Sequence, residues 1–386
     1  MRLLHPALTL VAILSFLCPA NAQGQKGSVS RTLDRILAPS RALDPNAVYV
    51  PAPRWTVALT GDLRQATFSQ TQDFSLPSAK LGPDGEMIVE ETPVNVSVYV
   101  KGKVGTGIGA QVGYGDLCLS LSRNLGGEGS DEVYSFDYQS ARYALQAQYF
   151  SYLNPVNYHQ IFGEEGDWRY REDDGITEKP GQIRSFLLDA FYAFNRRTFA
   201  YSAAYRGNLF QKRSAGSWMF GGKVILGDYR IDPEEEIARW VNGQSRQSTA
   251  QVSLGGGYSY NLVPFHRQPY GERDKGLRNL TINMTFLPMV TFFNQFSSTA
   301  YHDLENGVYK EVDKYVSNGK LQVNYVARLG IGYTYNLFSV NLSASNNDYS
   351  YSGNSSVVYR GYQTDDVKTE GKYFRWTATL RLGMRF

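Results

Sequence analysis

The chain has 386 residues, a formal net charge of +3, 37 glycines and 28 tyrosines. Because tyrosine favours strands and glycine weakens helix interiors, this composition argues against a helical bundle. Aromatic residues make up 14 % and charged residues only 19 %, unlike a disordered chain, and the near-neutral balance gives no reason to expect nucleic acid as a partner. The composition predicts a large all-β protein.

The N-terminus predicts export. Arg2 precedes an apolar run over residues 8–17, and residues 20–22 read Ala-Asn-Ala, a small-x-small cleavage site. These are the parts of a secretory signal peptide, which we therefore predict over residues 1–22. Only Cys118 remains after cleavage, so no internal disulfide is expected.

Residues 23–53 precede the first predicted strand. Within them, Leu33, Ile36 and Leu37 would share one face of a short helix. Two interpretations stay open, a loose periplasmic leader and a helix that plugs the barrel described below.

Twelve segments with apolar residues at alternate positions follow, and each is predicted to be a strand. They lie near residues 54–68, 94–114, 117–123, 133–139, 142–152, 183–195, 212–231, 248–262, 278–294, 319–336, 338–352 and 371–386. A split of the second segment near Lys101 would change the count, so a range of 10–14 strands is open.

Short and long connections largely alternate between these strands. The short turns at 115–116, 140–141 and 336–337 and the long polar loops between them match the periplasmic turns and extracellular loops of outer-membrane barrels. Two connections on the periplasmic side, 196–211 and 263–277, are too long for tight turns. They either fold into the lumen or form a rim.

The last strand favours a membrane barrel over a soluble sandwich. No segment after the signal peptide has about 20 consecutive apolar residues, the length of a membrane helix. Apolar residues of the last strand alternate with arginines, and the chain stops on an aromatic residue, which resembles the insertion signal of outer-membrane barrels. The residues of this signal are Phe374, Trp376, Leu380, Leu382, Met384 and Phe386.

The fold prediction is a transmembrane antiparallel β-barrel of about twelve strands over residues 54–386. Its expected location is the outer membrane of a Gram-negative bacterium. Its expected partners are outer-membrane lipid and, during insertion, the barrel-assembly machinery.

The opposite, polar face of the strands predicts a charged lumen. Twelve strands enclose more space than side chains alone can fill, so water or an inserted segment is expected inside. An excess of arginine there would favour anions. The candidate lumen-facing residues are Asp189, Lys223, Arg328, Arg375, Arg381 and Arg385.

No constellation predicts catalysis or a cofactor. His159, His266 and His302 lie in separate predicted connections and lack the neighbours of a barrel phospholipase. The acidic residues of 164–174 have no calcium-loop spacing and favour a solvated loop over a metal site. Gly255–Gly257 precede no helix, so a phosphate cradle is not indicated.

Two motifs carry a family resemblance. Residues 195–201 read Asn-Arg-Arg-Thr-Phe-Ala-Tyr, and residues 211–217 read Gln-Lys-Arg-Ser-Ala-Gly-Ser. They resemble a Bacteroidetes-type outer-membrane β-barrel family known only as a domain of unknown function, although Ala203 stands where that family often has proline. The resemblance covers about residues 45–386. It implies an outer-membrane barrel and no known activity, ligand or catalytic residue.

Three functions remain as hypotheses. The first is a passive pore or transport barrel with small hydrophilic solutes as cargo, because no large N-terminal plug domain precedes the strands. The second is a structural or adhesive protein that acts through its extracellular loops. The third, a lipid-modifying enzyme, has the least support.

Overall fold

The computed structural model describes residues 43–51, 55–81, 83–84, 86–102, 104–125, 130–163, 171–195, 197–235, 244–270, 274–304, 308–359 and 362–386. The predicted signal peptide and most of the predicted leader lie outside these residues. Within them, no helix is long and apolar enough to cross a membrane.

Twelve strands form a closed antiparallel ring, because the last strand pairs with the first from Lys368–Asp73 to Arg385–Thr56. This confirms the predicted barrel and its strand number. In ring order the strands are β2 (Trp55–Leu81), β4 (Gly105–Tyr114), β5 (Leu117–Asn124), β6 (Ser130–Gln139), β7 (Tyr143–Asn154), β10 (Gly181–Ala193), β12 (Ala215–Arg230), β13 (Gln244–Arg267), β14 (Arg278–Leu304), β16 (Gln322–Tyr335), β17 (Phe338–Tyr359) and β18 (Tyr362–Arg385).

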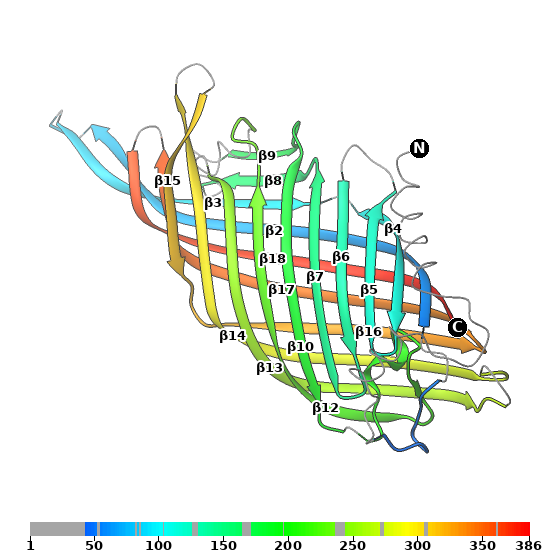
Figure 1. Ribbon diagram of the computed structural model, residues 1–386. Coiled ribbons are helices and arrows are strands. Elements are labelled where there is room, and N and C mark those ends of the chain that lie inside the picture. Colours follow the sequence, from blue (N-terminus) through cyan, green and yellow to red (C-terminus); the bar gives the residue numbers. More distant parts are fainter. Residues whose placement is uncertain are drawn as a thin grey trace.

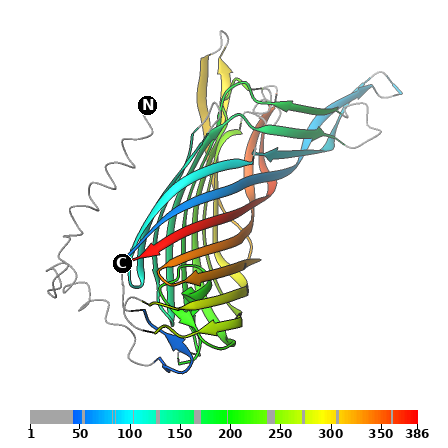
Figure 2. The same ribbon diagram turned by 90° about the vertical axis from the view of Figure 1, so that its right-hand side faces the viewer.

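Further strands extend one end of the ring, which we call the hairpin end (Figure 2). Here β3 (Met87–Lys101) pairs with the upper part of β2 and with β8 (Asn157–Phe162), β9 (Arg171–Ile176) pairs with β8, and β15 (Val308–Asn318) pairs with β14. Much of the chain predicted as loops is therefore strand. The reason is that paired backbones continue beyond the ring as hairpins.

The predicted strand 94–114 divides as the sequence allowed. β3 ends at Lys101 and β4 begins at Gly105. Between them, the Gly102 N–H donates to the Ala66 carbonyl at 2.9 Å, and a Cβ at Gly102 would lie 3.0 Å from the same oxygen. This close approach lets β3 leave the ring while β4 stays in it.

The opposite end, which we call the turn end, carries the short connections. The turns after β4 and β16 contain Gly115 and Asn336, with φ of 55° and 53°, a backbone region that glycine and asparagine tolerate. Both turns lie where the sequence predicted them. A short pair, β1 (Val48–Tyr49) with β11 (Phe210–Gln211), also lies at this end.

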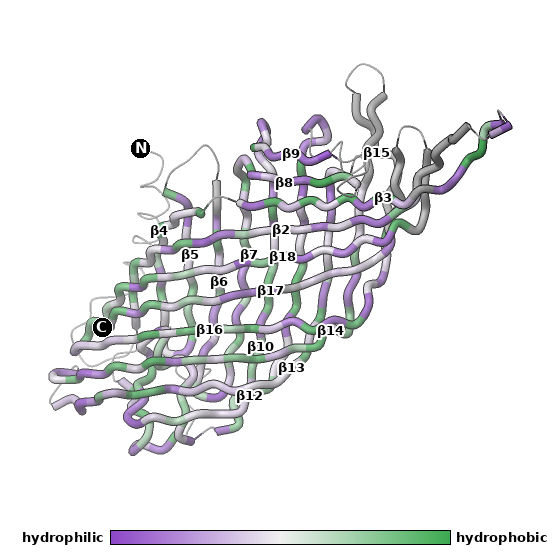
Figure 3. Tube along the Cα trace, turned by 180° about the vertical axis from the view of Figure 1, so that it is seen from behind, coloured by the Kyte–Doolittle hydropathy of each residue, from purple (hydrophilic) through white to green (hydrophobic). Residues whose placement is uncertain are grey.

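The outer surface of the ring is apolar. Along β18 the alternation turns Leu380, Leu382 and Met384 outward, with 44 %, 51 % and 39 % of their surface exposed. Hydrophobic and hydrophilic positions alternate along the strands in Figure 3. Aromatic pairs such as Trp218–Tyr258 and Phe265–Tyr333 lie near the turn end, with ring centroids 5.3 and 6.2 Å apart. An apolar belt bordered by aromatics is the lipid-facing surface of a membrane-spanning barrel.

The ring is flattened toward its hairpin end. In Figure 1 strands β2, β18, β17 and β16 cross behind the remaining strands, so two walls face each other. Phe68 of β2 stacks on Tyr229 of β12 with ring centroids 4.8 Å apart, although these strands are six places apart in the ring of twelve. Side chains from diametrically opposite strands therefore meet inside the barrel.

Candidate functional site

Residues 197–213, which we call the plug, fold into the turn end of the barrel. They include a one-turn 3-10 helix, Tyr201–Ala204, whose residues are all buried. Of the two alternatives for the connection 196–211, insertion into the lumen is the one observed for residues 197–211. In the other long connection, 263–277, residues 263–267 continue strand β13.

Amide side chains on the inner wall bind the plug. Asn261 and Asn341 donate to the Ala200 and Ala204 carbonyls at 2.8 and 3.0 Å, and the Tyr205 hydroxyl donates to Asn283 at 2.6 Å. The three asparagines are at most 2 % exposed. Because each buried amide is itself satisfied by a polar group of the plug, the wall and the plug stabilise each other.

Glycines of β16 make room for the plug. A Cβ at Gly330 would lie 2.6 Å from a ring carbon of Tyr205, and a Cβ at Gly332 would lie 2.9 Å from the Ala204 carbonyl oxygen. Real Cβ atoms do not approach so closely, so any larger residue at either position would push the plug away.

The motifs of the family resemblance shape the plug. The Asn195 carboxamide donates to the Gly216 carbonyl and accepts from the Thr198 hydroxyl, both at 2.9 Å. The Gln211 side chain accepts from the Ala200 N–H at 2.9 Å and donates to the Thr198 carbonyl. Asn195 and Gln211, one from each motif, thus form the hydrogen bonds that hold the two ends of the plug together.

Of the two candidate lumen charges on this part of β18, Arg385 holds the plug directly and Arg381 holds Asn341, a wall residue that binds the plug. Arg385 donates to the Gly207 carbonyl at 3.1 Å, pairs with Asp274 at 3.2 Å and lies over the Phe210 ring. Arg381 donates to Gln111 at 2.6 Å and to Asn341 at 3.0 Å. Both arginines are buried inside the barrel.

Tyr49 ties the short β1–β11 pair to the same network. Its hydroxyl donates to Asp274, the partner of Arg385. Burial and this hydrogen bond raise the pKa of the Tyr49 phenol above its ordinary value, so it stays a neutral donor.

A cavity of about 160 Å³ lies next to the plug, on its side toward the hairpin end. Its floor is Tyr201, Tyr205 and Arg206 of the plug, and its walls are almost wholly polar. The remaining charged residues that line it are Asp62, Arg64, Asp137, Asp189, Arg328 and Arg375. Carboxylates and guanidinium groups are mixed, so the lining does not have the one-sided positive charge that the sequence suggested.

The other candidate charges bridge the lumen at this level. Arg328 of β16 pairs with Asp189 of β10, four places away in the ring. Arg375 of β18 donates to Gln148 of β7 at 3.0 Å, and Lys223 of β12 donates to Asn347 of β17. All six candidate charges therefore lie inside the barrel, where they join its walls to each other or to the plug.

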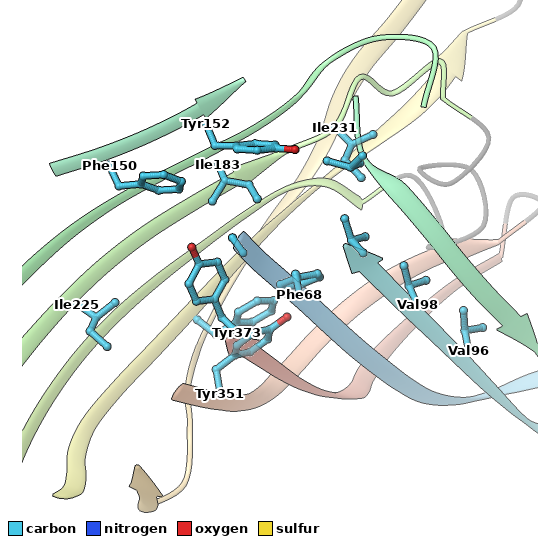
Figure 4. Packing of buried hydrophobic residues seen from close by; sticks show 14 of the residues in the cluster. Phe68, Val96, Val98, Phe150, Tyr152, Ile183, Ile225, Ile231, Tyr351 and Tyr373 are labelled. Carbon is cyan, nitrogen blue, oxygen red and sulfur yellow. The ribbon is translucent and has the colours of Figure 1, made fainter. Parts of the chain in front are cut away.

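On the side of the cavity toward the hairpin end, a hydrophobic cluster that we call the upper core closes the lumen. It includes Phe68, Phe296, Tyr351 and Tyr373. Tyr351 stacks on Phe296 with centroids 4.8 Å apart, and its hydroxyl donates to Gln70 and Gln247 at 3.1 and 3.2 Å. Figure 4 shows Phe68, Tyr351 and Tyr373 together between the two walls. The alternation of the sequence does not predict this cluster.

The two candidate histidines whose side chains the structure describes lie at opposite ends of the barrel. His159 lies in β8 at the hairpin end, 2.8 Å from Asp174, whereas His266 lies near the turn end with its Nδ1 3.2 Å from Asn279. His302 belongs to β14, and its side chain is outside the described residues. Within the part of the chain that the structure describes, no group of three or more His, Cys, Asp or Glu side chains is arranged to hold a metal.

The residues of the predicted insertion signal lie on β18, except Phe386, which follows the last residue of that strand. Leu380, Leu382, Met384 and Phe386 are exposed on the belt. Phe374 and Trp376 are partly buried, and the Trp376 indole donates to Gln65 at 3.2 Å. Their role in insertion remains a prediction.

These features define a class, a membrane-spanning antiparallel β-barrel with a plugged lumen. The chain belongs to the family described as a domain of unknown function, DUF4421, whose sequence model matches residues 86–364. This confirms the predicted relationship to a family without an assigned activity. Comparison with curated proteins gives no match.

Several solved outer-membrane proteins resemble the chain. The Escherichia coli outer membrane protease OmpT has 9 % identity and a TM-score of 0.41, with 88 % of this chain and 99 % of that chain covered. OprG from Pseudomonas aeruginosa has 10 % identity and a TM-score of 0.24, covering 89 % and 99 %. A Pseudomonas aeruginosa FadL homologue has 10 % identity and a TM-score of 0.17, covering 86 % and 90 %. At these values we carry over no activity.

Proposed function

We propose that the protein is an outer-membrane barrel of a Gram-negative bacterium that is closed in its resting state and acts at the cell surface. The turn end then faces the periplasm and the hairpin end the exterior, as in other barrels of this kind. The observation that carries the proposal is the double closure of the lumen, by the plug at one end and the upper core at the other.

The hairpin end supports a surface role. Met87 and Val89, near the tip of the β2–β3 hairpin, are 73 % and 66 % exposed. Large apolar side chains at a tip away from the lipid belt suit contact with another molecule. In this proposal the barrel is an anchor, and the hairpins are the working surface.

A gated pore is the second candidate function. The polar cavity of about 160 Å³ has room for ordered water or a small hydrophilic solute between the two closures. Passage would require the plug and the upper core to open in turn. A passive, permanently open pore has less support than either candidate.

Single-channel recording in planar bilayers separates these functions. We expect the purified wild type to give no conductance steps. A variant that replaces 197–210 by a short Gly-Asn turn, and a second variant with Phe68→Ser and Tyr351→Ser, should also be silent, because each retains one closure in series. The combination of both changes should conduct.

Steady conductance of the wild type would contradict the closed resting state. Brief wild-type openings that the plug replacement lengthens would favour the gated pore. Heat-modifiable migration in gels checks that each variant is a folded barrel.

A further inference from the structure

Two arginines lie directly opposite each other on the outer surface at the turn end. Arg267, at the end of β13, is the cross-strand partner of Arg278, at the start of β14. Both are exposed, and directly opposed like charges destabilise a sheet. Such a pair is stable when an anion lies between the two guanidinium groups.

The chain contains a second opposed pair that shows how the repulsion is relieved. At the hairpin end, Arg230 of β12 faces Arg246 of β13. The two oxygens of Asp228 accept from them at 2.8 and 2.9 Å, one from each arginine. The carboxylate thus supplies the anion for this pair.

Three carboxylates described at the turn end have other partners, and one of them, Asp116, accepts from the Asn208 amide at 3.1 Å. Asp274 pairs with Arg385 inside the barrel at 3.2 Å, and Asp44 pairs with Arg213 at 3.4 Å. Among the residues that the structure describes, no carboxylate forms an ion pair with Arg267 or Arg278. The described carboxylates therefore leave the two guanidinium groups free to bind an anion that the described residues do not supply.

The surroundings indicate which anion fits. The Arg278 guanidinium lies 5.2 Å from the Tyr335 ring centroid, and that of Arg267 lies 6.0 Å from Tyr270. Stacking on a ring leaves the N–H edges of a guanidinium able to bind oxygen anions. One row further into the belt, Phe265 is paired with Leu280 and contacts Tyr333.

We propose that Arg267 and Arg278 bind the headgroup of an anionic phospholipid in the leaflet at the turn end. The phosphate lies between the guanidinium groups, at the border of the belt where headgroups are found, and the acyl chains follow Phe265 and Leu280. The inference depends on the membrane-spanning barrel, with the turn end periplasmic as proposed above, and not on whether the lumen conducts.

Native mass spectrometry of the full-length protein with added lipid tests this site. The wild type should retain phosphatidylglycerol in preference to phosphatidylcholine, which also carries phosphate but no net charge. The double variant Arg267→Gln, Arg278→Gln should lose about thirtyfold of that preference, since each basic residue near a headgroup contributes about 1 kcal/mol. The matched control Arg230→Gln, Arg246→Gln removes the same charge at the other end and should change the preference less than about twofold.

Two outcomes would overturn the proposal. The first is an unchanged lipid preference in the Arg267, Arg278 variant; if this variant also co-sediments less with cell-wall sacculi, the arginines bind a wall glycan instead. The second is an equal loss of lipid preference in the control variant. Conductance is not part of this readout, so its result is independent of the closed-lumen proposal.

Discussion

Replacement of Arg328 by methionine is expected to lower the free energy of unfolding by about 3–5 kcal/mol, the usual cost of removing one partner of a buried ion pair. Arg328 pairs with Asp189 inside the barrel and donates to the Tyr201 hydroxyl of the plug at 3.2 Å. Without the guanidinium, the buried Asp189 carboxylate loses its ion pair and keeps only Lys223, its cross-strand partner, as a nearby positive charge. The plug also loses one contact with the wall.

Urea unfolding from lipid vesicles, followed by tryptophan fluorescence, measures this loss. The double variant Arg328→Met, Asp189→Asn should recover part of it, because the carboxylate is no longer left without its guanidinium partner, although Lys223 then loses Asp189 as a neighbouring charge. Arg123→Met is the matched surface control, since Arg123 pairs with Glu132 at 3.1 Å in an exposed position, and it should cost at most about 1 kcal/mol. An Arg328→Met variant as stable as this control would show that the buried pair does not hold the lumen together.

Replacement of Tyr351 by alanine is expected to cost about 3–5 kcal/mol, the range for removal of a large buried aromatic side chain. Tyr351 is 1 % exposed and stacks between Phe68 and Phe296. Its loss leaves a cavity in the upper core and removes the hydroxyl that Gln70 and Gln247 share.

The same unfolding measurement separates packing from hydrogen bonding at this position. Tyr351→Phe keeps the ring and should cost about 1–3 kcal/mol, for the loss of the hydroxyl's hydrogen bonds to Gln70 and Gln247. Met87→Ala, at an exposed hairpin tip, should change stability by less than about 0.5 kcal/mol. If Tyr351→Ala unfolded at the same urea concentration as Met87→Ala, the upper core would not be a packed core.

The ring of twelve strands was predictable because one physical rule acts along most of the chain. In a membrane-spanning strand the outward residues contact lipid and the inward ones do not, so alternation identifies the strand and its faces. The rule placed Leu380 and Leu382 on the belt and Arg375 and Arg381 inside. It also predicted the short turns, because strand ends follow directly from strand lengths.

The sequence does not predict the upper core, because the face that carries the apolar residues changes from the outside to the inside along a strand. In β17, Val340 and Leu342 point outward in the belt, but further along the strand Tyr351 points inward while polar Asp348 lies on the outer face. In β3, Val96 and Val98 point inward and Ser97 outward. Beyond the membrane the solvent is water, so the hairpin end packs like a soluble β-sandwich. A search for such inversions would have found it.

The plug could be located from the sequence only as an unusually long connection. The resemblance singled out Asn195 and Gln211 without a structural role, and that role depends on loop contacts that no periodicity encodes. Gly330 and Gly332 looked like ordinary strand glycines, although they lie where the plug touches β16. Contacts between segments distant in sequence are set by the assembled barrel, so they required the structure.

The contact between opposite walls is the central claim, and a distance measurement across the barrel tests it most directly. Spin labels at Thr67→Cys of β2 and Leu226→Cys of β12, with Cys118 replaced by serine, lie on the outer faces of the two walls. Pulsed electron paramagnetic resonance then reports their separation in vesicles. Facing sheets in contact are about 10 Å apart, whereas a round ring of twelve strands would be about 24 Å across. We predict a single narrow distribution of distances, set by the spacing of about 10 Å plus the lengths of the labels. A distribution longer by about 14 Å would contradict it.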